Sequence, residues 1–175
     1  MLVTGMRAAG AILVVFGAAG LGAFFAGHFL GRLRELEELR RLMYLMKGEI
    51  LFAGASLDEG FERAGERLGG AAGAFALRLA GKIRERRGEE FREIWEEEAR
   101  AFASRYLNGE DLEQMLAFGR QLGYLDRQMQ ERTILLYLEQ LERSIGALQN
   151  RKGETCRLCA GLSLAGGLFL VIIMC

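Results

Sequence analysis

The residues best suited to chemistry are two cysteines late in the chain. Cys156 and Cys159 form the sequence Cys-Arg-Leu-Cys, a spacing that can supply half of a zinc site or a redox pair. The other half is missing, because the sequence has no second pair of cysteines with this spacing and only one histidine, His28, at the opposite end of the chain. We therefore expect no metal, no cofactor and no redox role, and interpret both cysteines as small side chains at a membrane boundary.

His28 is the other candidate, because it is the only strongly polar residue between positions 8 and 31. A proton relay inside a membrane needs a second ionisable group. Neither this stretch nor the apolar stretch at positions 158–175 contains one. We expect the imidazole to lie at the level of the lipid headgroups, where an amphipathic ring is stable, and a transport role is disfavoured.

No other pattern in the sequence is typical of an enzyme or a nucleic-acid-binding protein. There is no evident pairing of a nucleophile with a base, and the 24 glycines form no phosphate-binding loop with its lysine. The 23 basic residues are balanced by 23 acidic ones, whereas binding to a phosphate backbone favours a basic excess. We expect a protein that is not an enzyme and binds no nucleic acid.

Two stretches without charged side chains flank the charged part of the chain. Residues 8–31 would rise about 36 Å as a helix, against about 30 Å of bilayer hydrocarbon. Residues 158–175 carry no charge and are close to the lower length limit of a spanning helix. We predict an N-terminal transmembrane segment at residues 1–31, a cytoplasmic helical bundle at residues 32–157, and a C-terminal transmembrane segment at residues 158–175.

Basic residues set the predicted orientation of the two spans. Arg7 alone precedes the first span. Basic side chains follow the first span and precede the second, at Arg32, Arg34, Arg40, Arg41, Arg143, Arg151, Lys152 and Arg157. Because such residues favour the cytoplasmic side, we expect a multi-pass protein of the cell membrane with both termini outside. A cleaved signal peptide is the alternative for the first stretch, but its apolar run exceeds the roughly 7 to 15 residues of such signals.

The central domain is predicted to be all-α. Proline is absent, and Leu, Glu, Arg, Ala and Gln favour helix. Apolar residues repeat at spacings of three and four at Leu36, Leu39, Met43, Met46 and Ile50, and again at Ile134, Leu138, Leu141 and Ile145. These seams predict amphipathic helices next to each span. The whole is expected to be a cytoplasmic bundle of about six helices flanked by two transmembrane helices.

Caps and glycines predict the helix ends in between. Ser56 followed by Glu59 is typical of a capping box that starts a helix ending at Leu68. Further helices are predicted at residues 71–86 and 89–106, with Trp95 on the buried face of the second. Asn108 and Gly109 break the chain before a fifth helix. Its predicted C-cap is Gly123, and Asp126 is the predicted cap of the last helix.

Two short runs of charge are candidate partner-binding residues. They comprise Arg84, Arg86 and Arg87 and the acidic run Glu96, Glu97 and Glu98. Each run could dock a partner or simply form the solvated face of a helix. The sequence alone leaves both interpretations open.

The sequence LAFGRQLGYLDRQMQ at residues 116–130 resembles stage III sporulation protein AB of endospore-forming bacteria. The matching motif positions are Phe118, Gly119, Leu122, Gly123, Asp126 and Gln130, and Glu49 and Trp95 also agree. The resemblance covers essentially the whole chain, including the two-span layout, but its motifs are packing and capping residues. Relatives often carry prolines where this chain has Gly-Ala-Ser-Leu-Asp at residues 54–58, so the start of the second helix is expected to differ in shape.

The resemblance implies a component of the secretion-like channel between mother cell and forespore, on the mother-cell side of the outer forespore membrane. It also implies a cytoplasmic domain similar to the platform domains of type II secretion and type IV pilus systems. The expected partners are a secretion-type ATPase, stage III sporulation protein AA, and other channel subunits. A second copy of the chain in a homo-oligomer is a further candidate that does not depend on the resemblance. A membrane-tethered signalling or adaptor protein and a subunit of a small transporter are the alternatives.

Overall fold

The computed structural model describes the backbone of residues 2–85, 90–103, 106–123 and 127–174. Within these ranges it describes the side chains of residues 26–151 except Arg127, and before them those of Gly17, Gly20 and Phe24. The chain divides into two units: residues 31–146 form one, and residues 1–30 with 147–175 form the other.

The unit of the chain ends contains the first part of helix α1 (Leu2–Gly48) and the last part of helix α6 (Arg127–Met174). Among the described residues, no helix has a stretch both long and apolar enough to cross a bilayer. The predicted span at residues 158–175 lies outside the described side chains, and so does most of the span predicted at residues 8–31.

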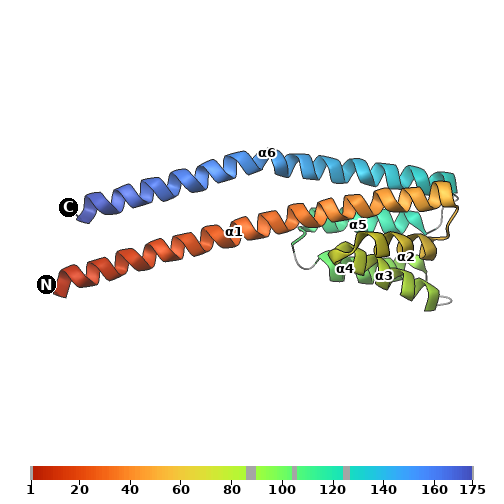
Figure 1. Cartoon of the computed structure of the whole chain (residues 1–175), viewed down its shortest axis with the longest axis horizontal. Helices are drawn as coiled ribbons and strands as arrows, with labels where there is room; N and C mark the ends of the chain where they lie inside the picture. Colours follow the sequence, from red (N-terminus) through yellow and green to blue (C-terminus); the bar gives the residue numbers. More distant parts are fainter. Residues whose placement is uncertain (1, 86–89, 104–105, 124–126, 175) are drawn as a thin grey trace. The chain divides into compact units, whose positions relative to one another are not determined.

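The unit of residues 31–146 is helical in all its regular elements. The remainder of α1 leads into a π-helical turn, η1 (Glu49–Ala53), and α6 begins at Arg127. Between them lie α2 (Leu57–Leu68), α3 (Gly70–Glu85), α4 (Phe91–Ala103) and α5 (Gly109–Leu122). In Figure 1, α1 and α6 run antiparallel beside these four shorter helices. The all-α prediction is confirmed, with no strand among the described residues.

The two helices predicted to flank the bundle are not separate elements. α1 is continuous from Leu2 to Gly48, and α6 from Arg127 to Met174. The described backbone thus contains six α-helices and one π turn, with the predicted spans belonging to the first and last of the six.

The predicted apolar seams are confirmed as core. On α1 and η1, Leu36, Leu39, Met43, Met46 and Ile50 are each at most 1% exposed. On α6, Ile134, Leu138, Leu141 and Ile145 are also buried. Full burial of such a side chain contributes about 1.5 to 3 kcal/mol, so these two seams supply much of the driving force that holds α1 and α6 in the bundle.

The caps were predicted less well than the seams. Ser56 is the N-cap of α2, but its hydroxyl donates to the carboxylate of Asp58 and makes no backbone cap, so the capping box with Glu59 is wrong. The capping box lies at α5 instead, where Asn108 Oδ1 accepts from the Asp111 N–H at 2.8 Å and Asp111 Oδ2 accepts from the Asn108 N–H at 3.1 Å. An aspartate serves here because its short carboxylate can still reach the N-cap N–H.

Glycines end the helices in two different ways. Gly54 and Gly69 cap η1 and α2 with φ of 65° and 64°, a region that side chains avoid. Gly123 is the C-cap of α5 as predicted, but its φ of −69° is right-handed and needs no glycine. A glycine is needed at this position for packing against Phe91. Asp126, the predicted cap of α6, lies outside the described residues.

Candidate partner-binding surface

The basic run is partly engaged within the bundle. Arg84, in the last turn of α3, donates from Nη1 and Nη2 to the Glu62 carboxylate of α2 at 3.1 and 2.8 Å, and lies 3.7 Å from Asp58. These hydrogen bonds raise the pKa of Arg84 and lower that of Glu62. Half of the Arg84 side chain remains exposed. Arg86 and Arg87 lie outside the described residues.

The acidic run divides into an exposed and a buried part. Glu98 of α4 is buried, and its carboxylate accepts from Arg78 Nε at 2.8 Å and from Lys82 Nζ at 2.7 Å. Burial alone would raise the pKa of Glu98, but the hydrogen bonds from Lys82 and Arg78 outweigh it and hold that pKa below its usual range. Glu98 therefore joins α3 to α4 and is not part of an open acidic face.

Glu96 and Glu97 remain as the accessible part of that run. Glu97 is exposed and lies 2.9 Å from Lys82, and Glu96 is partly exposed. Arg84 and Lys82 both belong to α3, but Arg84 pairs with a glutamate of α2, whereas Lys82 pairs with glutamates of α4. The two candidate runs are consequently engaged with different helices, and their role in binding a partner stays a prediction.

A partly buried ion pair ties α5 to α1, and no sequence pattern predicted it. Arg32 donates from Nε and Nη2 to the two oxygens of Asp111 at 2.7 and 2.9 Å, and the Asp111 side chain is only 2% exposed. The hydrogen bond to Asp111 raises the pKa of Arg32. Because Asp111 also completes the capping box, one carboxylate both starts α5 and fixes it to α1. The only sign of this contact in the sequence was the position of Asp111 in the first turn of a predicted helix.

Two further glutamates, one in α1 and one in η1, bind neighbouring helices. Glu38 accepts from the Ala72 N–H at the start of α3 at 3.3 Å. Glu49, a position that matched the sporulation family, is buried in η1 and pairs with Arg63 and Arg67 of α2 at 3.3 and 3.0 Å. An anion is favourable near a helix N-terminus, and a buried carboxylate left without its cationic partners is strongly destabilising. Glu49 therefore has a structural role.

The Phe-Gly motif of α5 is explained by its contact with Trp95. The indole is fully buried and donates from Nε1 to the Met115 carbonyl at 2.8 Å. A Cβ atom on Gly119 would lie 1.9 Å from Trp95 Cδ1, which is far inside van der Waals contact. Phe118 packs against the same indole, with ring centroids 5.2 Å apart. Only glycine at position 119 lets α5 approach this close to α4.

The second glycine of the motif has a similar role. A Cβ atom on Gly123 would lie 2.9 Å from Phe91 Cδ1, while Leu122 is fully buried beside it. Gln130 is partly exposed on α6, and Asp126 lies outside the described residues. The part of the motif from Phe118 to Gly123 therefore encodes the packing of α4 against α5.

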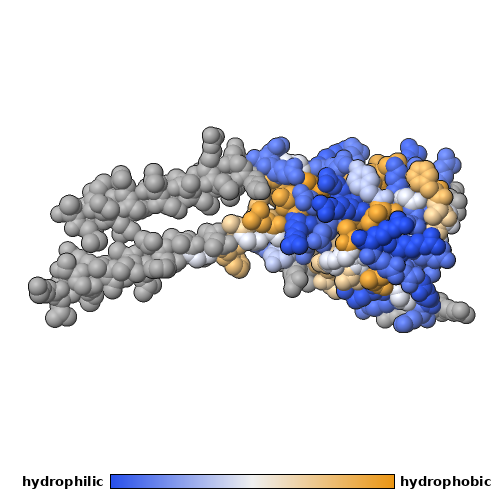
Figure 2. All heavy atoms as spheres, viewed as in Figure 1, coloured by the Kyte–Doolittle hydropathy of each residue, from blue (hydrophilic) through white to orange (hydrophobic). Residues whose placement is uncertain are grey.

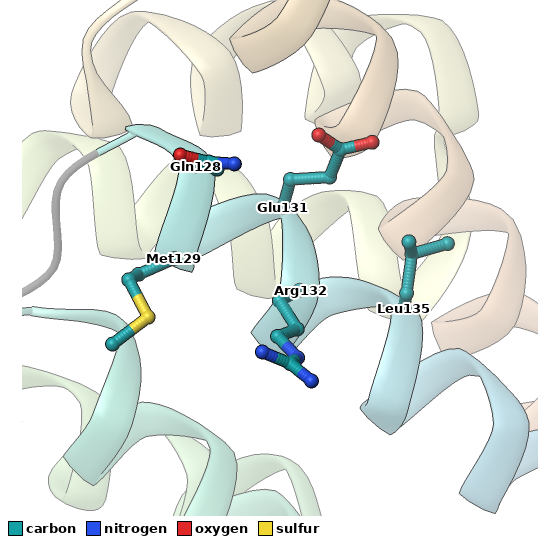
Figure 3. A pocket seen from close by; sticks show the side chains of 5 residues that line it. All are labelled: Gln128, Met129, Glu131, Arg132 and Leu135. Carbon is teal, nitrogen blue, oxygen red and sulfur yellow. The ribbon is translucent and has the colours of Figure 1, made fainter.

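A shallow hollow of about 450 Å³ lies on the first turns of α6. It is lined by Gln128, Met129, Glu131, Arg132 and Leu135 (Figure 3). Its polar groups come from one helix and show no pairing of a nucleophile with a base.

The residues first considered for chemistry lie elsewhere. His28, in the unit of the chain ends, is exposed and stacks on Phe24 with ring centroids 6.5 Å apart. The side chains of Cys156 and Cys159 lie outside the described part of the chain. Among the residues that are described, no group of three His, Cys, Asp or Glu side chains could hold a metal ion.

Comparison with protein families decides the relationship. The family model for stage III sporulation protein AB matches residues 7–175. The chain belongs to this sporulation protein family. A solved structure of a stage III sporulation protein AB (SpoIIIAB) is similar in fold, with a TM-score of 0.63 at 20% identity over 71% of this chain and 98% of that one. The comparison with curated proteins gave no significant match.

Family membership confirms the resemblance found in the motif of α5 and around Trp95. It establishes a sporulation protein with a helical bundle, and the family's name specifies no enzymatic activity.

Proposed function

We propose that the chain is a membrane-anchored, non-catalytic platform subunit of a secretion-like channel between mother cell and forespore. The observation that carries the proposal is the arrangement of residues 31–146 between two apolar chain segments. The first and last helices of this bundle are the ones that continue into residues 8–31 and 158–175. The length and apolar character of those stretches support two transmembrane helices.

The charge pattern supports a location for the bundle. Basic residues adjoin both proposed spans on the bundle's side, which favours a cytoplasmic bundle. We place the protein in the outer forespore membrane, with the bundle in the mother cell. An impermeant thiol reagent on intact cells should then label Cys175 and leave a cysteine introduced for Glu66, an exposed residue of α2, unlabelled. Labelling only at position 66 would reverse the orientation.

The proposed partner is a cytoplasmic secretion-type ATPase, stage III sporulation protein AA. The bundle's described residues provide no phosphate-binding loop, so any work driven by nucleotide hydrolysis has to reach it through protein contact. Exposed charges steer such contacts and can be changed without disturbing a core. Glu97, with Glu96 beside it, and the half-exposed Arg84 are the candidates that fit this description.

The test uses full-length protein in detergent and the purified ATPase. Exchanging Glu96 and Glu97 together for Lys should weaken ATPase binding about tenfold or more if both lie in the contact. The matched control exchanges Glu66 and Glu113, exposed glutamates of α2 and α5, for Lys. Equal binding by both variants would remove the α4 residues from the interface, and no binding by the unmodified protein would remove the platform mechanism.

A further inference from the structure

Large apolar side chains are exposed along the pair formed by α1–η1 and α6. Tyr44 and Phe52 are 51% and 88% exposed on the first, and Met129, Leu135 and Leu136 are 42% to 53% exposed on the second. In Figure 2 apolar surface interrupts the hydrophilic surface near the end where α1 finishes and α6 begins. We call these five residues the seam patch. Exposed apolar patches can mark interaction sites.

The π turn contributes to the seam patch by redirecting Phe52. In a regular α-helix, with about 100° per residue, Phe52 would point about 80° away from Tyr44. The π turn, bonded from i to i+5, rotates less per residue and brings Phe52 back toward the face of Tyr44. Gly54, at φ 65°, then ends the turn. The fold thus presents an aromatic ring to solvent on the same side as Tyr44.

One hydrogen bond sets the register of the two helices. Tyr44 Oη donates to Glu142 Oε1 at 2.8 Å, and the helices are antiparallel (Figure 1). Residues later in α1 therefore lie at the same height along the helix pair as residues earlier in α6. Phe52 is about level with Leu135, at one end of the hollow of α6, and Lys47 is about level with Glu139.

We propose that the seam patch binds a second copy of the chain about a two-fold axis parallel to α1 and α6. Rotation about this axis keeps every residue at its height. Phe52 of each copy then faces Leu135 and the hollow of α6 in the other copy. Such isologous two-fold contacts are the commonest in oligomers. In this one each aromatic ring would meet Met129 and Leu135 of the other copy's hollow, beside its polar residues Gln128, Glu131 and Arg132.

The charges on α1 and α6 favour a second copy of the chain as the partner, with α1 of one copy packed against α6 of the other. The side of α1 near Tyr44 carries Arg40, Arg41 and Lys47, whereas α6 carries the exposed Glu139 and Glu142. Packing α1 against α1 would oppose the basic side chains. Packing α1 against α6 of the second copy places Lys47 at the height of Glu139, a carboxylate that also accepts from Arg143 on the solvent side. Complementary charges of this kind set the register of an interface.

The first experiment changes the exposed ring. Full-length protein in detergent is examined for its oligomeric state by sedimentation, and Phe52→Glu should raise the dimer dissociation constant about tenfold or more. Since Phe52 is 88% exposed, the melting temperature should not change at concentrations where both proteins are monomeric. Leu77→Glu on α3, also an exposed apolar position, is the matched control and should dimerise normally. A monomer at every concentration, or a dimer indifferent to Phe52→Glu, overturns the proposal.

The second experiment tests the register by exchanging charges. Lys47→Glu and Glu139→Lys should each weaken the dimer, and the double variant should restore it, because the pair is re-formed with reversed sign. A double variant as weak as the two single ones would contradict the proposed two-fold arrangement. None of these residues belongs to the α3–α4 surface proposed for the ATPase, so failure of one proposal leaves the other intact.

Discussion

Helix α5 is fixed at its two ends by opposite kinds of contact. At its C-terminal half, Gly119 and Gly123 admit Trp95 and Phe91 of α4 with no room for a methyl group. At its N-terminus, the buried Asp111 binds Arg32 of α1 through two hydrogen bonds. The apolar contact requires that positions 119 and 123 carry no side chain, whereas the charged contact requires that both Arg32 and Asp111 are present. They should therefore fail in different ways when altered.

The largest effect is expected from Gly119→Ala. The added methyl carbon would lie 1.9 Å from the indole, so either Trp95 or α5 must move. Overpacking of this severity should cost about 3 kcal/mol or more of unfolding free energy. Chemical denaturation of the detergent-solubilised protein measures it. Gly81→Ala, at a helical glycine of α3 with open space around it, is the control and should be neutral or slightly stabilising.

A double variant shows whether the indole is the cause. Trp95→Ala alone should cost about 3 to 5 kcal/mol, but adding Gly119→Ala to it should cost little, because the clashing ring is gone. Strictly additive losses would mean that Gly119 is needed for another reason.

A smaller effect is expected from Asp111→Asn. The amide keeps the shape of the carboxylate and can still accept from the Asn108 N–H, but it leaves the Arg32 charge without its counterion. Because the Arg32 side chain is 23% exposed, water compensates part of the loss, and we expect about 2 kcal/mol, below the 3 to 5 of a fully buried pair. Adding Arg32→Met to Asp111→Asn should recover part of the lost free energy of unfolding, because the unpaired charge is then removed. A double variant less stable than Asp111→Asn alone would show that Arg32 stabilises through its own packing.

The difference between the two ends of α5 also explains what could be predicted from the sequence. The all-α fold, the two apolar seams and the burial of Trp95 follow from periodicity, which is a local property of a helix. The motif at Phe118 and Gly119 could be recognised by resemblance, but its reason could not, because it depends on an indole twenty-four positions earlier in the chain. Arg32 and Asp111 are separated by most of the bundle, and nothing local distinguishes them from other charged residues.

Charge runs were the least predictable feature, for a related reason. Glu96, Glu97 and Glu98 are neighbours in sequence, yet successive helical residues point about 100° apart. Of the three, only Glu98 is buried, where it binds both Arg78 and Lys82, whereas Glu97 binds Lys82 from an exposed position. A run of like residues on a helix therefore spans both the core-facing and the solvent-facing sides.

The pair at Glu98 predicts a pH dependence. Its lowered pKa means that its stabilising contribution is present above the unfolded-state value of about 4.3 and is lost as the pH falls through the lower folded-state value. Glu98→Gln should lower the melting temperature at pH 7 and differ progressively less from the unmodified protein toward pH 3. A difference that stays constant over this range would assign the effect to packing and not to charge.

The smallest effect is expected at the exposed pair of Arg84 and Glu62. Its two hydrogen bonds resemble the geometry of Arg32 with Asp111, but here both side chains are substantially exposed, at 51% and 39%. Water solvates either charge when the other is removed, and exposed pairs are screened by salt. Glu62→Gln should therefore leave the melting temperature within experimental error, at low and at high salt. A loss comparable to that of Asp111→Asn would show that hydrogen-bond geometry, rather than burial, determines how much these charged contacts stabilise the bundle.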